Sequence, residues 1–177
     1  MKRLTCFTLL ALCSMLFASQ AMAQTYTGEF LFQQFDFRQI DLLGSGPVAG
    51  GVSGNTLVVS STGGQSQDVA NNLAKSTLNW SISFDKTAAA SMNTSIVSTP
   101  YTGTFTYNQG GPITVIGTGT LIGGPRGNTV YLATSNGRMG VGGVNPTSLP
   151  LDDPNTANFN WTMSLNQGDV NNFLGSK

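Results

Sequence analysis

Acidic side chains that could bind a metal ion are few in this chain, and one short segment has three possible oxygen ligands close together. Asp152 and Asp153 lie between Pro150 and Pro154, and Asn155 follows Pro154 directly. Their oxygen atoms are ligands that Ca²⁺ prefers, so the three residues form a candidate metal site. Their spacing matches no EF-hand loop, however, and aspartate is common in solvated turns. We therefore expect a turn without metal there.

Two tryptophans are the candidates for ligand binding. Trp80 begins the segment WSISF, and Trp161 begins the similar segment WTMSL; each follows an asparagine. Because a tryptophan ring can stack on a sugar or an aromatic ligand, Trp80 and Trp161 are candidate ligand-binding residues. Each also alternates with other large apolar side chains, and that pattern favours a place in the core.

Residues for catalysis are not apparent. The chain has no histidine, and its two cysteines lie within the first 13 residues. Without these residues, the usual pairs of nucleophile and base cannot form. Asp36 with Asp41, and Asp152 with Asp153, remain as carboxylate pairs, but a general acid also needs an apolar setting that raises its pKa. We therefore predict no catalytic residues, no enzymatic activity and no bound cofactor.

The amino-terminal end has the organisation of a signal peptide. Lys2 and Arg3 form a basic region, residues 4–17 form an apolar stretch, and Ala21-Met22-Ala23 is a small-x-small cleavage pattern. We expect residues 1–23 to be removed, which leaves a single domain over residues 24–177 without any cysteine. The protein is then secreted, to the periplasm, the cell surface or the outside of what we expect to be a bacterial cell.

The charge balance argues against one class of partner. Of 8 basic and 8 acidic residues, Lys2 and Arg3 leave with the signal peptide, so the mature net charge is −2. Without a basic patch, nucleic acid is not an expected partner. No second apolar stretch is long enough to cross a bilayer, so we expect no transmembrane helix.

The elements that must position these residues occur twice in the sequence. Gly44–Gly64 (GSGPVAGGVSGNTLVVSSTGG) matches Gly117–Gly137 (GTGTLIGGPRGNTVYLATSNG) over 21 positions without a gap, with 8 identities. Tyr26–Phe30 matches Tyr101–Phe105 before it, and the two tryptophan segments match after it. Three matches in the same order predict a duplicated unit, covering about residues 26–100 and 101–177.

A period of two dominates both units and predicts antiparallel strands with one apolar face. Helices are expected to be short and minor, with Asp68 and Asp169 as candidate caps. Four strands are expected in each unit: Tyr26–Gln34, Phe37–Gly46, Thr56–Ser61 and Thr77–Phe84, then Tyr101–Asn108, Ile113–Leu121, Thr129–Thr134 and Asn158–Leu165.

Two four-stranded units must bury their apolar faces against each other. We therefore predict one all-β domain of eight strands, which is either a barrel or a sandwich. Many large side chains are expected to point inward, which favours a filled interior. These side chains are Tyr26, Phe30, Phe32, Trp80, Phe84, Tyr101, Phe105, Tyr107 and Trp161.

Together these features predict an exported, non-catalytic β-rich module that acts at the cell surface or in the extracellular matrix, in a structural, adhesive or self-assembling role. Its expected partners are copies of itself, surface polysaccharide or other envelope proteins. One alternative is a small barrel that binds an apolar ligand inside. Another is an eight-stranded outer-membrane barrel, whose apolar face would point outward.

Overall fold

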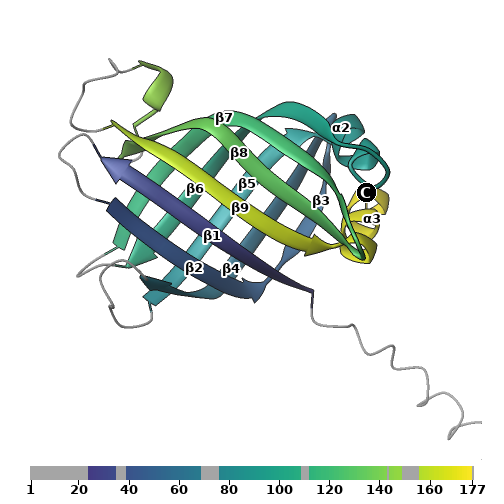
Figure 1. The fold of residues 1–177 in the computed structure, drawn as a ribbon, viewed down its shortest axis with the longest axis horizontal. Coiled ribbons are helices and arrows are strands. Elements are labelled where there is room, and N and C mark those ends of the chain that lie inside the picture. The colour runs from purple at the N-terminus through teal and green to yellow at the C-terminus, as the bar shows by residue number, and fades with distance from the viewer. Residues whose placement is uncertain are drawn as a thin grey trace, which may run out of the picture.

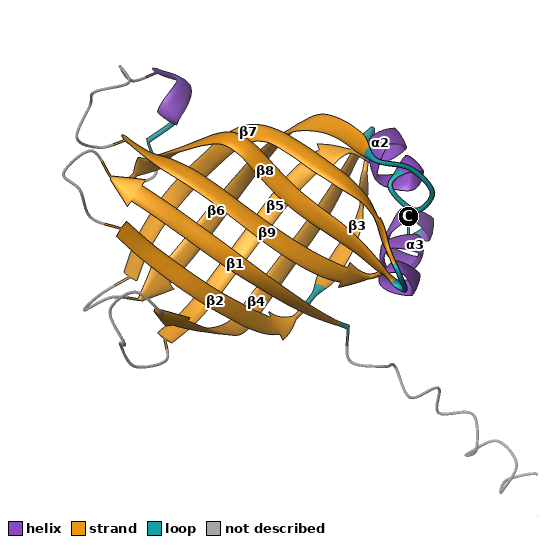
Figure 2. Cartoon of the chain, in the orientation of Figure 1, coloured by secondary structure: helices purple, strands orange, loops and turns teal. Residues whose placement is uncertain are grey.

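The chain folds into a closed antiparallel β-barrel (Figures 1 and 2). The structure is a computed structural model, and it describes residues 24–34, 39–68, 76–108, 112–142, 144–148 and 156–176. The described residues form nine strands in the order β2-β1-β9-β8-β7-β6-β5-β4-β3, and β2 also pairs with β4. That last pairing closes eight strands into the barrel and leaves β3 with β4 as its one neighbour. The sequence allowed a barrel or a sandwich, and the barrel is confirmed.

The strands of the first half are β1 (Thr25–Gln34), β2 (Gln39–Pro47), β3 (Ala49–Ser53), β4 (Thr56–Asp68) and β5 (Ser76–Asp85). Those of the second half are β6 (Val97–Asn108), β7 (Pro112–Arg126), β8 (Thr129–Val141) and β9 (Thr156–Asn166). Strand β3 was not predicted, and β7 runs five residues past the expected end at Leu121. Both differences fall in glycine-rich segments, which carry too few apolar side chains to show alternation.

Strands β4 and β8 each continue seven residues past the ends predicted at Ser61 and Thr134. The cause is an irregularity in each ladder, between Ser61 and Gly64 against β5, and between Ala133 and Arg138 against β9. An extra residue in a strand shifts the alternation by one position. The inward-facing residues beyond the irregularity therefore fall out of phase with those before it, and the sequence pattern ends too early.

Two short helices lie together at one end of the barrel (Figure 1). Helix α2 (Lys86–Ser91) begins after Asp85, whose side chain accepts a hydrogen bond from the Ala88 N–H at 2.8 Å. Helix α3 (Gln167–Gly175) is capped by Asn166, which accepts from the Gly168 N–H at 2.8 Å.

Of the two candidate caps named from the sequence, Asp169 was wrong in position, because Asn166 caps α3. Asp169 lies in the first turn of α3, and Asp68 is the last residue of β4. The segment after Asp68 that was to form a helical turn lies outside the described residues. One 3₁₀ turn, η1, spans Pro146–Ser148. None of the helices in the described ranges is long and apolar enough to cross a membrane.

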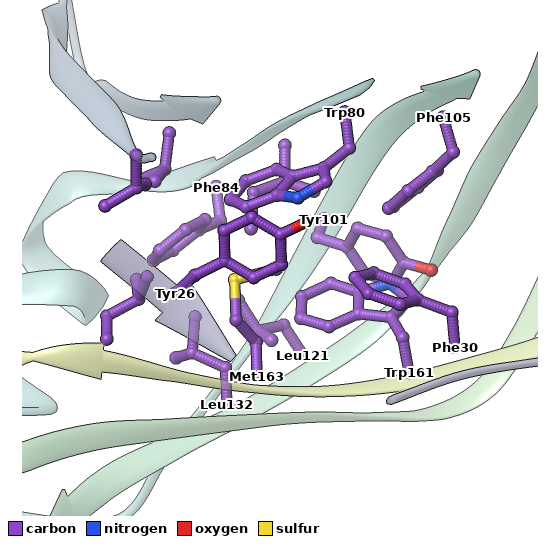
Figure 3. Packing of buried hydrophobic residues seen from close by; sticks show 14 of the residues in the cluster. Tyr26, Phe30, Trp80, Phe84, Tyr101, Phe105, Leu121, Leu132, Trp161 and Met163 are labelled. Atoms are coloured by element: carbon purple, nitrogen blue, oxygen red, sulfur yellow. The ribbon is translucent and has the colours of Figure 1, made fainter. Parts of the chain in front are cut away.

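The core lies inside the barrel (Figure 3). Along β6, buried Tyr101, Phe105 and Tyr107 alternate with threonines on the outer face. Eight of the nine side chains predicted to point inward are buried, with exposed fractions of 5% or less. The ninth, Phe32, lies outside the described side chains. Inward-facing glycines make room for the rings: a Cβ on Gly117 would lie 2.9 Å from the ring of Phe159.

Candidate functional site

Each tryptophan packs against a tyrosine inside the barrel (Figure 3). The ring of Trp80, on β5, meets Tyr26, on β1, edge to face, with centroids 4.9 Å apart and planes at 85°. The ring of Trp161, on β9, meets Tyr101, on β6, in the same way, at 5.3 Å and 88°. Such edge-to-face contacts are a favoured arrangement of aromatic side chains. We call these two groups the tyrosine–tryptophan clusters.

The two candidate ligand-binding residues thus lie in the core. Trp80 is 3% exposed and Trp161 is 1% exposed. Phe105 and Phe159 join the second cluster, with Phe105 centred 6.3 Å from Trp161 and 4.7 Å from Phe159. In this arrangement neither indole ring presents a free face on which a sugar could stack.

A small hydroxyl side chain lies beside each tyrosine, Ser61 in the first cluster and Thr134 in the second, and the two residues align in the similar segments 44–64 and 117–137. The Trp161 N–H of the backbone donates to Thr134 Oγ1 at 2.9 Å. Five other polar atoms of the clusters are buried without a hydrogen bond of good geometry: Tyr26 Oη, Ser61 Oγ, Trp80 Nε1, Tyr101 Oη and Trp161 Nε1.

Burial controls the ionisation of the tyrosines. It raises the pKa of Tyr101 to about 12, although the neighbouring Trp161 and Thr134 side chains oppose part of the rise. Burial raises the pKa of Tyr26 as well, against the opposing effect of Trp80 and Ser61. Both shifts follow from the cost of placing a phenolate in an apolar interior.

Raising the pH above about 10 is therefore expected to destabilise the barrel. Tyrosine in an unfolded chain has a pKa near ~10, so between that pH and about 12 the unfolded state ionises while folded Tyr101 stays neutral. The stability that neutral Tyr101 contributes is complete below pH ~10 and is lost as the pH rises through the folded pKa. A plot of the free energy of unfolding against pH, from about pH 8 to about pH 12, measures this loss. Tyr101→Phe should flatten the plot, and an equal slope in both proteins would contradict the prediction.

The asparagine before each tryptophan holds the irregularity in the adjacent strand. Asn79 Oδ1 accepts a hydrogen bond from the Gly63 N–H at 2.6 Å, and Asn160 Oδ1 accepts from the Gly137 N–H at 3.3 Å. Gly63 has a φ of 75°, in the left-handed region that favours glycine. In each half, the tryptophan of an Asn-Trp pair thus points into the barrel. The asparagine before it accepts a hydrogen bond from the bulge in the neighbouring strand.

The sequence did not lead us to recognise one group of candidate residues, which consists of these two asparagines with Ser61 and Thr134. The signal was present, because each of them lies at a matching position of the repeated segments. Alternation alone could not single them out, since asparagine is common on the outer face of any strand and a buried hydroxyl such as that of Ser61 does not stand out from exposed ones in a sequence pattern.

An apolar cavity lies beneath the two helices. Its volume is about 10 Å³, comparable to the space that a single water molecule needs. Leu57, Phe84, Leu132 and Leu165 come from the barrel wall, while Ala89 and Val170 come from the helices. This cavity has no room for a larger ligand unless the helices move.

The outer surface over β5, β6 and β7 carries many hydroxyl groups, which we call the hydroxyl face, although Ile116 interrupts the row on β7 opposite Thr104. Ser81 lies opposite Thr104, and Thr102 lies opposite Thr118. Thr106 and Thr114 share a hydrogen bond of 3.1 Å between their hydroxyls. The hydroxyl face consists of Ser81, Ser83, Thr102, Thr104, Thr106, Thr114, Thr118 and Thr120, none of which is charged.

The candidate metal residues, Asp152, Asp153 and Asn155, lie outside the described residues, as does Asp36. Asp41 is half-buried on β2. The candidate metal site and both carboxylate pairs therefore include residues outside the described part of the chain. Comparisons of the chain with family models, with curated protein sequences and with solved structures find no match.

Proposed function

We propose that this protein is an exported, non-catalytic β-barrel module that acts at the cell surface or in the extracellular matrix, in a structural, adhesive or self-assembling role. The observation that carries the proposal is the close packing of large side chains inside the described part of the barrel. The aromatic side chains of the tyrosine–tryptophan clusters occupy the barrel, and the cavity under the helices is about 10 Å³. Side chains can fill an eight-stranded barrel and leave no room for a ligand inside. We therefore place the function of this protein on its outer surface.

The character of the outer surface supports the same proposal. The hydroxyl face offers donors and acceptors without charge, and the mature chain has a net charge of only −2. A surface with little net charge gives little repulsion between copies. The partners that suit this surface are copies of the protein itself, neutral surface polysaccharide and other envelope proteins.

We further infer that the barrel is built from two copies of one unit, over about residues 26–100 and 101–177. Matching positions of the sequence repeat occupy matching places in the two clusters: Tyr26 and Tyr101, Ser61 and Thr134, Trp80 and Trp161. Asn79 and Asn160 also each accept a hydrogen bond from a backbone N–H at a bulge, although the donors, Gly63 and Gly137, lie one position apart in the aligned segments.

The strongest alternative is a barrel that carries an apolar ligand. It is favoured by the apolar lining of the cavity and by the position of α2 and α3 above it, because a movement of the helices would enlarge the space. The outer-membrane barrel has less support, since the large apolar side chains face inward. Among the described residues, the large apolar side chains that are exposed are Leu43, Ile96, Ile122 and Val144.

Expression of the full chain in a bacterial host tests the proposal. We expect the protein in the envelope or the medium, with an intact mass that corresponds to a chain starting at Gln24. The purified protein should sediment as a mixture of monomer and larger species or bind insoluble cell-surface polysaccharide in a pull-down. A monomer that ignores polysaccharide and yields an apolar small molecule on solvent extraction would support the carrier function instead.

A further inference from the structure

The bulge in β8 contains the one Asn-Gly dipeptide of the sequence, Asn136-Gly137. Both residues lie opposite Gly119 of β7, because the pairing of the two strands shifts between Thr118 and Thr120. Two residues against one is the arrangement of a β-bulge. Asn136 is exposed, whereas Gly137 is buried. Solvent therefore reaches the asparagine much more readily than the glycine that follows it.

An asparagine that precedes a glycine can lose its side-chain amide without an enzyme. The backbone nitrogen of Gly137 would attack Asn136 Cγ, so that a new N–C bond forms while the amide nitrogen leaves with the Gly137 N–H proton as ammonia. Water then opens the resulting succinimide at one carbonyl to give aspartate, or at the other to give isoaspartate, in which the backbone runs through the side-chain carbons. Glycine permits the ring to close because it has no side chain to hinder rotation of the backbone.

The native bulge keeps the two reacting atoms apart. Asn136 has a φ of 53° and is the one residue other than glycine with a positive φ in the described part of the chain. In this left-handed region ψ is about +30 to +60°. At such a ψ the nitrogen of the next residue points away from the asparagine side chain. Ring closure therefore requires a rotation about the Cα–C bond of Asn136.

A hydrogen bond opposes that rotation. The Gly137 N–H donates to Oδ1 of Asn160, on β9, at 3.3 Å. Rotation of the peptide plane between residues 136 and 137 would turn this N–H away from its acceptor. Asn160 therefore binds the same nitrogen that would have to attack Asn136.

The first half of the barrel has a similar bulge without the reactive residue. Gly63 corresponds to Asn136 in the aligned segments 44–64 and 117–137, and its φ is 75°. There, Asn79 Oδ1 accepts from the N–H of Gly63 itself. In the second half the bound N–H is that of the next residue, which is the nitrogen that can attack an asparagine.

We propose that Asn136 is a site of spontaneous deamidation in this protein, and that Asn160 sets the rate of the reaction. The reaction proceeds from an opened bulge, in which the bond to Asn160 is broken. Isoaspartate lengthens the backbone beside Gly137, which lies so close to the backbone oxygen of Phe159 that a Cβ would overlap it. The product therefore cannot restore the native bulge, and deamidation marks copies of the protein in which β8 and β9 have separated.

Peptide mapping by mass spectrometry measures the reaction in the full protein during incubation in mildly alkaline buffer. Trypsin cuts after Arg126 and Arg138, so residues 127–138 are released as one peptide. Fragmentation distinguishes conversion at Asn136 from conversion at Asn128, and chromatography separates the isoaspartyl form. We expect conversion at Asn136 to be at least about tenfold faster in urea, where no bulge restricts the backbone, than in the native protein.

Three variants test the role of the hydrogen bond. Asn160→Ala removes the acceptor and should raise the rate of conversion at Asn136 about fivefold, as the loss of one hydrogen bond implies. Asn160→Asp keeps an acceptor oxygen, and its rate should stay near that of the native protein. Asn79→Ala is the matched control, because it removes the corresponding acceptor in the first half and leaves the Gly137 N–H bound.

Circular dichroism checks the fold of each variant, and chemical denaturation gives its free energy of unfolding. If the rates follow only these free energies, or if Asn160→Ala reacts no faster than the native protein, Asn160 does not set the rate. If Asn160→Ala fails to fold, the comparison of native and urea-unfolded protein decides, and equal rates there overturn the protection by the bulge. A chain that shows no conversion at Asn136 even in urea overturns the site itself.

Discussion

Replacing Trp161 with alanine is expected to lower the free energy of unfolding by about 3–5 kcal/mol, and Trp80→Ala should have a similar effect. Both indoles are almost completely buried, and each packs edge to face on a tyrosine. Removing either ring leaves a cavity that the rigid barrel wall cannot collapse to fill. The loss therefore includes both the transfer of the ring from the core and the empty volume left behind.

Chemical denaturation followed by circular dichroism measures these losses. Trp161→Phe keeps an aromatic ring and should cost less than Trp161→Ala. Thr102→Ala on the hydroxyl face is the surface control, with an expected change within about 0.5 kcal/mol. If a tryptophan-to-alanine variant kept the stability of the native protein, that tryptophan would not be part of the core, and a ligand-stacking role would become the better interpretation.

Replacing Gly137 with alanine is expected to cost about 3 kcal/mol or more, because the added methyl group would overlap the backbone oxygen of Phe159. Gly137 lies on β8 at the irregularity against β9, where its N–H bonds to Asn160. Backbone on a neighbouring strand cannot move aside as a flexible side chain can. The strands must therefore separate, which also disturbs the packing of Trp161.

Two further glycines serve as comparisons for Gly137→Ala: one that should also be sensitive to alanine and one that should not. Gly64 occupies the corresponding position in β4, and a Cβ there would lie 2.6 Å from the backbone oxygen of Leu78, so Gly64→Ala should be destabilising as well. Gly175, at the end of α3, has nothing within 4 Å of a Cβ, and Gly175→Ala should cause no loss. Thermal unfolding of the three variants side by side distinguishes them. Equal melting temperatures for Gly137→Ala and Gly175→Ala would contradict the close approach of β8 and β9.

Much of the local structure could be predicted from the sequence, because period-two alternation depends only on neighbours along the chain. The segments around Trp80, Tyr101 and Trp161 are examples, and their apolar residues are the ones that the structure buries. The strand ends were less accurate where the phase of alternation changes, after Ser61 and Thr134. Strand β3 was missed because its glycines carry no side chain that could show which face is buried.

The candidate site, too, could be predicted from the sequence only in part. That Trp80 and Trp161 belong to the core was predicted from their strand neighbours, whereas their tyrosine partners were not. Tyr26 meets Trp80 across 54 positions of sequence, and Tyr101 meets Trp161 across 60. Such contacts depend on which strands become neighbours in the sheet, and no local pattern contains that information.

The sequence by itself determined that the chain is all-β, that each strand has one apolar face, and that large aromatic side chains fill the space between those faces. Only the tertiary structure decided that the faces meet in a barrel, through the pairing of β1 with β9 and of β2 with β4. It also decided that β3 has a single neighbour and that an asparagine holds each bulge. The physical reason is that alternation fixes the direction of a side chain relative to its own strand, while closure of a sheet depends on hydrogen bonds between strands far apart in the chain.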